Sequence, residues 1–172
     1  MQPISDRLAR ANFINSGPVD QQSAATPRLF AYGTLMIDEV IKILLDRVPN
    51  RERATAEGWR VAQLVGRPYP GLVGQSRSVA SGTVYTDLTV DEWILLDTFE
   101  DPSYTLNSIA LTTGGIAYTY VWPERPAEVH TGDWKISGLT ATAIETYLTR
   151  CEAWRKTYEA KKCTLCRHVD YG

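Results

Sequence analysis

The sequence is poor in histidine and cysteine. It has two histidines, His130 and His168, and three cysteines among 172 residues. A Ser-His-Asp or Cys-His site needs a histidine held beside its nucleophile, and we place these two in a loop and in the C-terminal tail. The Walker loop, the dinucleotide fingerprint and the HExxH motif are also absent. These absences argue against histidine-based nucleophilic catalysis, P-loop nucleotide chemistry and zinc proteases.

Long apolar runs and an excess of one charge are missing too. No apolar run approaches the roughly 18 residues of a membrane helix, and Asp6, Arg7 and Arg10 occupy the place of a secretory signal's apolar stretch. The 18 basic and 20 acidic residues leave a net charge of −2, which gives no reason to expect nucleic acid or a membrane as partner. Three cysteines do not suggest a secreted disulfide framework. We expect a cytoplasmic protein that is a monomer or a weak homodimer.

The C-terminal cysteines form half of a possible metal motif. Cys163, Cys166 and His168 follow the spacing C-x-x-C-x-H, and Cys151 is the one further cysteine. A structural zinc site uses four ligands at suitable spacing. We therefore interpret the motif as two reduced thiols in a basic tail and expect no metal site.

Length and composition predict one domain between two polar ends. A chain of 172 residues suits a single domain. Residues 1–27 are predicted to be a flexible N-terminal arm, because Asn15 to Pro27 is rich in Gln, Ser, Pro and Ala and cannot bury enough apolar area to offset its ordering. Residues 28–160 form the predicted domain, and residues 161–172 form a polar C-terminal tail.

The apolar periodicity predicts strands and helices without regular alternation. This order disfavours a doubly wound sheet and favours an α+β fold, in which a mixed sheet or small barrel carries helices outside. The predicted strands are 28–32, 58–65 and 79–85, followed by a hairpin of 108–112 with 116–122. Two predicted helices begin at Asp38 and at the capping box Thr89–Glu92. A third predicted helix spans 140–158.

Two local features have the chemistry of a site. The turn Tyr32-Gly33-Thr34-Leu35 follows an apolar strand, and its backbone N–H groups can face a pocket and hold an oxyanion. Glu100 follows the end of a short helix beside large apolar residues, and a carboxylate desolvated there has a raised pKa and can act as a base. Taken singly, the residues favour simpler interpretations, a strand exit and a surface glutamate.

The sequence contains blocks whose order resembles a known family. It resembles the gamma-glutamylcyclotransferase-like superfamily, and within it the plant avirulence-induced-protein-like branch. The resemblance covers roughly residues 28 to 158. It rests on residues 30–36 (FAYGTLM), 69–72 (YPGL), 82–85 (GTVY), 96–101 (LDTFED) with Tyr104, and 120–122 (YVW).

The resemblance implies a fold, a reaction and a set of site residues. It implies a small closed mixed β-barrel flanked by helices, with one cavity and no metal or organic cofactor. The substrate would be a γ-glutamyl amide or amine, cyclised to 5-oxoproline with release of the amine. Glu100 matches the general acid/base of the family. The expected substrate-binding residues are Tyr32, Gly33, Thr34, Leu35, Tyr104 and Tyr120.

The residue inventory agrees with this chemistry, because the substrate's α-amino group is its own nucleophile and the protein needs no Ser, Cys or His. One position departs from the pattern: many relatives carry an arginine two residues after the tyrosine matching Tyr104, and Leu106 stands there. Two alternatives therefore stay open. One is a non-catalytic binding module on the same fold, and the other is an interaction protein that binds a partner through its arm and basic tail.

Overall fold

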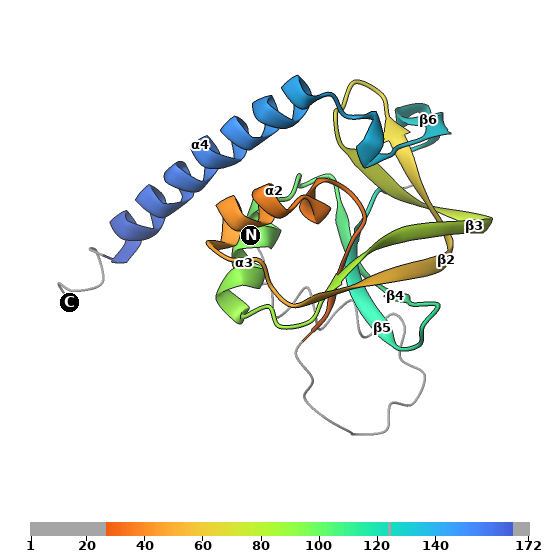
Figure 1. Cartoon of the computed structure of the whole chain (residues 1–172), viewed down its shortest axis with the longest axis horizontal. Helices are drawn as coiled ribbons and strands as arrows, with labels where there is room; N and C mark the ends of the chain where they lie inside the picture. The colour runs from red at the N-terminus through yellow and green to blue at the C-terminus, as the bar shows by residue number, and fades with distance from the viewer. Residues whose placement is uncertain (1–26, 124, 167–172) are drawn as a thin grey trace.

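The computed structural model describes residues 27–123 and 125–166 (Figure 1). Within them, one six-stranded sheet has the order β4-β5-β1-β3-β2-β6, and three α-helices pack against it. The strands are β1 (Leu29–Ala31), β2 (Arg51–Leu64), β3 (Pro70–Tyr85), β4 (Thr105–Ala110), β5 (Ile116–Val121) and β6 (Val129–Asp133); the helices are α2 (Asp38–Leu45), α3 (Val90–Phe99) and α4 (Ala141–Cys166).

The α+β fold with a mixed sheet is confirmed, but the sheet is a curled half-barrel and the prediction of a closed barrel is wrong. Among the described residues, β4 and β6 form the two edges and do not pair with each other. The curl comes from β2 and β3, whose register shifts between Glu57 and Trp59, where Gly58 has a φ of 79°. Such a bulge bends the paired strands, and here the bend does not bring the two edges together.

The short strand β1 lies inside the sheet, between β5 and β3. It pairs antiparallel with the second half of β3 and parallel with β5. The first half of β3 turns back and pairs with the end of β5, joining Leu72 to Val121. The chain therefore leaves the sheet after Ala31 beside a junction of three strands.

The helices cover one end of the sheet and enclose the larger core. Val40 and Leu44 of α2 and Trp93 and Leu96 of α3 are buried against the sheet. Helix α4 packs across α2 and then runs away from the sheet (Figure 1). No helix among the described residues has the length and apolarity needed to cross a bilayer.

Helix α4 is longer than predicted. It begins at Ala141 and ends at Cys166, because no glycine or proline interrupts this stretch. The first residues of the predicted tail 161–172 are therefore helical. Residues 167–172 lie outside the described part, as does the predicted arm apart from Pro27.

The start of α3 is fixed by the predicted capping box, which is confirmed. The Glu92 N–H donates to Thr89 Oγ1 at 3.2 Å, and the Thr89 N–H donates to Glu92 Oε2 at 2.7 Å. Arg47 lies two residues beyond the end of α2 at Leu45. Its Nε donates to Glu92 Oε1 at 2.6 Å, so an ion pair ties the exit of α2 to the start of α3.

Glycine 82 is required by the close approach of β1 and β3. A Cβ added there would lie 2.4 Å from the Ala31 carbonyl oxygen and 2.7 Å from the Phe30 ring. We expect Gly82→Ala to force the two strands apart and to lower the unfolding free energy by about 1–3 kcal/mol in urea denaturation. Gly74→Ala in the same strand is the matched control, because a Cβ there meets nothing within 4 Å. Equal losses in the two variants would contradict this account.

Candidate active site

A cavity of about 330 Å³ lies where β1 leaves the sheet. Its walls come from the loop after β1, the start of β3, the end of α3 and one face of α4. The structure brings every predicted site residue to this cavity, although more than sixty positions separate the loop from Glu100. The predicted site residues are Tyr32, Gly33, Thr34, Leu35, Glu100, Tyr104 and Tyr120. Their roles in binding and catalysis stay predictions.

The loop after β1 turns directly into a short 3-10 helix, η1 (Thr34–Met36), which was not predicted. The Met36 N–H donates to the Gly33 carbonyl at 2.9 Å. The first N–H groups of such a helix have no acceptor within it, so those of Thr34 and Leu35 are available to a ligand oxygen. Gly33 is needed because a Cβ there would lie 2.8 Å from the Pro70 ring.

Glu100 ends α3 and places a carboxyl group in the cavity. Its N–H donates to the Leu96 carbonyl at 3.0 Å, and the residue is half-buried. Burial first, and then the charges of Asp101 and Asp97, raise the pKa of Glu100 to about 8. A carboxyl group with this pKa can both accept and return a proton near neutral pH.

Asp101 is the fixed negative charge beside Glu100. Burial raises its pKa, but hydrogen bonds from the Ser103 N–H and hydroxyl and from the Tyr69 hydroxyl, together with the charge of Arg67, lower it to about 2. The Tyr69 hydroxyl donates to Asp101 Oδ2 at 2.8 Å, and Arg67 donates to the same oxygen at 2.7 Å. Asp101 is thus ionised at neutral pH and keeps the neighbouring Glu100 protonated to a higher pH.

The tyrosines of the site are held by hydrogen bonds. Tyr32 donates its hydroxyl to the Tyr120 carbonyl, and Tyr104 donates to the Pro70 carbonyl. Burial is the main cause that raises the pKa of both Tyr32 and Tyr104. Tyr120 donates to Asp97 Oδ1 at 3.1 Å. The Tyr32 and Tyr104 hydroxyls stay protonated at neutral pH, and the three side chains form part of the cavity wall that also contains Glu100.

Helix α4 supplies cavity residues that the sequence did not identify: Tyr147, Arg150 and Trp154. The Thr34 hydroxyl donates to the Tyr147 oxygen at 2.9 Å, and Trp154 meets Phe99 edge-on with ring centroids 5.0 Å apart. Spacings of three and four residues place the three side chains on one helix face. Arg150 is exposed and lines the cavity.

Leu106, which stands where many relatives carry an arginine, is surrounded by apolar residues of the core. Leu106 lies in β4 opposite Tyr120 and is 6% exposed, within the core between sheet and helices. No charged side chain of this chain therefore reaches Glu100 from that position.

No cluster of three or more metal-ligating side chains occurs in the described part of the chain. Cys151 is buried and Cys163 is exposed. The side chain of Cys166 and all of His168 lie outside the described residues, so the C-x-x-C-x-H motif is not described as a unit.

Comparison with known proteins places the chain in a family. Residues 29–136 match the family described as "Gamma-glutamyl cyclotransferase, AIG2-like". The chain is 30% identical over 141 residues to "AIG2-like protein C" of Arabidopsis thaliana, covering 77% of this chain and 82% of that protein. It is 29% identical over 126 residues to "AIG2-like protein D" of the same plant, covering 70% and 83%.

Solved structures show the same fold. A solution structure of an Arabidopsis thaliana protein superposes with a TM-score of 0.57 at 26% identity, covering 84% of this chain and 98% of that one. A second from the same plant gives a TM-score of 0.56 at 24% identity, covering 82% and 88%. The resemblance drawn from the sequence blocks is confirmed. The chain belongs to the gamma-glutamyl cyclotransferase, AIG2-like family.

Proposed function

We propose that this protein cyclises a γ-glutamyl amide or amine to 5-oxoproline and releases the amine, with Glu100 as general acid and base. One observation carries the proposal: a half-buried carboxyl group with a pKa of about 8 lines the same cavity as the backbone that begins η1. Family membership supports it. The cavity therefore combines a proton acceptor with N–H donors for a carbonyl oxygen.

The reaction needs no nucleophile from the protein. The Glu100 carboxylate takes a proton from the substrate's α-ammonium group, and the freed nitrogen attacks the γ-carbonyl carbon to close a five-membered ring. The N–H groups of Thr34 and Leu35 stabilise the negative charge that develops on the carbonyl oxygen. Glu100 then donates a proton to the departing nitrogen as its bond to carbon breaks. The two protons lost by the α-ammonium group end on the released amine.

The shape of the cavity contributes through orientation. Buried tyrosines at positions 32, 104 and 120 line the cavity together with Glu100 and the loop. A glutamyl chain held there is curled, with its amine close to its own γ-carbonyl. Ring closure then gains the large effective concentration of an oriented intramolecular reaction.

Leu106 favours a second candidate function. If catalysis in this family depends on a cation two residues after Tyr104, the buried Leu106 removes it. The protein would then be a non-catalytic binding module that holds γ-glutamyl compounds in the same cavity.

The pH dependence of turnover tests the proposed function. We expect 5-oxoproline release from a panel of γ-glutamyl compounds, with kcat/KM rising through pH 6–8 and levelling above the Glu100 pKa of about 8. The direction follows because only the carboxylate form accepts the proton, and its fraction falls about tenfold per pH unit below the pKa. Calorimetric binding of the same compounds without 5-oxoproline release at any pH would favour the binding module.

A further inference from the structure

The outer part of the cavity is built by a segment beyond the family match. The match ends at residue 136, and α4 begins at Ala141. Arg150 of this helix is the only cation among the described residues that line the cavity. Among the described residues that line the cavity, the one cation thus comes from a helix outside the matched region.

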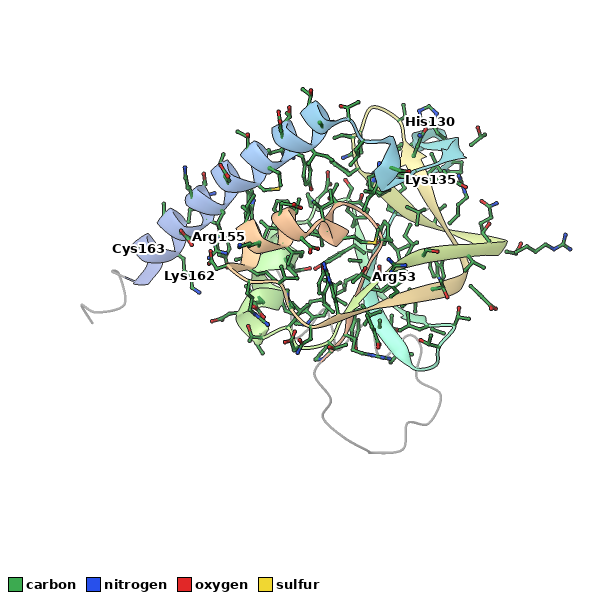
Figure 2. The ribbon with its side chains drawn as sticks, viewed as in Figure 1. Arg53, His130, Lys135, Arg155, Lys162 and Cys163 are labelled. Atoms are coloured by element: carbon green, nitrogen blue, oxygen red, sulfur yellow. The ribbon has the colours of Figure 1, made fainter. Side chains whose placement is uncertain are left out.

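The Arg150 side chain is free to bind a ligand. No described residue forms a hydrogen bond or ion pair with its guanidinium group. Arg155, on the next turn, shows the opposite situation: it donates to the Leu44 carbonyl and to Asp46 Oδ2, the latter at 2.8 Å. Figure 2 labels Arg155 on α4, whereas Lys162 and Cys163 lie near the end of the helix far from the sheet. Contacts with α2 and its C-terminal end therefore hold Arg155 in place, whereas Arg150 stays exposed at the cavity.

The cavity has an inner and an outer part. Tyr32, Tyr104 and Tyr120 are each at most 8% exposed, whereas Arg150 is exposed and Trp154 is half-buried. The glutamyl group must reach Glu100 and the start of η1, so it occupies the inner part. The amine that is to be released then extends outward, toward α4.

The charges near Glu100 and near α4 agree with the division of the cavity into an inner and an outer part. The principal charges acting on the pKa of Glu100 are Asp101 and Asp97. The charge of Arg150 instead acts on its helix neighbours Tyr147 and Cys151, whose pKa values are raised mainly by burial and are lowered by this cation. Arg150 is therefore placed to meet the outer end of a substrate.

We propose that Arg150 binds a carboxylate on the amine that is released, with Trp154 packing against that amine's side chain. The preferred substrates are then γ-glutamyl derivatives of amino acids or peptides, in which the leaving amine is anionic at its far end. The inference rests on the proposed function for its catalytic readout. A guanidinium group suits a carboxylate because it can donate two parallel hydrogen bonds.

A matched pair of substrates tests this assignment. γ-Glutamylalanine and γ-glutamylethylamine differ by one carboxylate on the leaving side. We expect the unmodified protein to prefer γ-glutamylalanine, and Arg150→Gln to lower kcat/KM for it by about tenfold or more while changing the ethylamine compound by less than about twofold. Arg150→Lys should restore part of the preference. Lys162→Gln, which removes a positive charge from the distant part of the same helix, should change neither substrate.

Two results would overturn the assignment. An equal loss on both substrates would show that Arg150 acts on the glutamyl half or on the fold, and no loss on either would show that it binds neither. If the unmodified protein releases 5-oxoproline from neither compound, the proposed function fails, and calorimetric affinities for the same pair decide the role of Arg150. A preference for γ-glutamylalanine that Arg150→Gln abolishes would support it, and equal affinities in the unmodified protein would refute it.

Discussion

Glu100→Gln is expected to lower kcat for 5-oxoproline release by at least about 10²–10⁴-fold, the usual contribution of general acid–base catalysis. Glutamine has nearly the same shape and can hydrogen-bond at the end of α3, so the fold and ligand binding should persist. It cannot accept the ammonium proton at neutral pH, and the nucleophile stays blocked. The measurement is single-turnover release of 5-oxoproline, with calorimetry to confirm that the variant still binds substrate.

Asp97→Asn is the matched control, one helical turn earlier. Asp97 accepts a hydrogen bond from the Tyr120 hydroxyl at 3.1 Å, which an asparagine oxygen can also accept. Removing its charge should lower the pKa of Glu100, since Asp97 is one of the charges that raise it. We expect a mainly structural cost, with activity kept and its acid limb moved to lower pH. Near-full activity in Glu100→Gln together with loss in Asp97→Asn would assign the reaction to the other carboxylate.

Glu100→Gln should also remove a pH dependence of the unfolding free energy. Glu100 has a folded-state pKa of about 8 against an ordinary value of 4.5, so between these values the folded chain holds a proton that the unfolded chain releases. The unfolding free energy therefore falls as pH rises through this window. One pKa unit corresponds to about 1.4 kcal/mol, and the expected fall between pH 5 and 8.5 is on the order of 3–4 kcal/mol.

Urea denaturation at pH 5 and pH 8.5 measures this effect. Because Gln is neutral throughout, the stability of Glu100→Gln relative to the unmodified protein should increase as pH rises. Other shifted groups act elsewhere: Asp101 has a pKa of about 2, and burial raises the pKa of Cys151 to about 11. Parallel pH profiles of the two proteins would show that the Glu100 carboxyl is not desolvated as described.

The sequence predicted the inner part of the site because its blocks contain residues with strict steric needs. Gly33 is pressed against Pro70, and a Cβ on Gly71 would lie 2.8 Å from that of Trp122. Such positions tolerate no side chain, so the pattern of glycines and aromatic residues is recognisable. Glu100 was identified because it matches the glutamate of the family block at 96–101, and the capping box predicted the start of the helix that it ends.

The long strands and the sixth strand were harder to predict. Residues 51–57 read RERATAE, and Ala54 and Ala56 are the buried side chains of that alternation. Small residues of low β-propensity give a weak strand signal. In β6 only Val129 is partly buried, so no alternation marks it. The bend of β2 and β3 depends on a bulge, which alternation of apolar residues does not reveal.

The outer part of the cavity depends on tertiary contacts. Arg150 and Trp154 reach the site because α4 packs across α2, and nothing local in the helix distinguishes Arg150 from the other basic residues around it. The interaction of Arg67 and Tyr69 with Asp101 likewise joins residues more than thirty positions apart. Sequence periodicity identifies a face of a helix but not the surface it will meet.

Helix α4 is joined to the rest of the described chain by side-chain packing, by the Arg155 contacts and by the hydrogen bond between Thr34 and Tyr147. The residues proposed to hold the glutamyl group lie, by contrast, in the sheet, in the η1 turn that follows β1 and at the end of α3. On the assignment proposed for Arg150, selectivity for the released amine can diversify through exchange of a few α4 side chains without altering the proposed chemistry. A designer who wants a new leaving group can confine a combinatorial library to positions 150 and 154, because Tyr147 is hydrogen-bonded to Thr34 of the proposed catalytic turn.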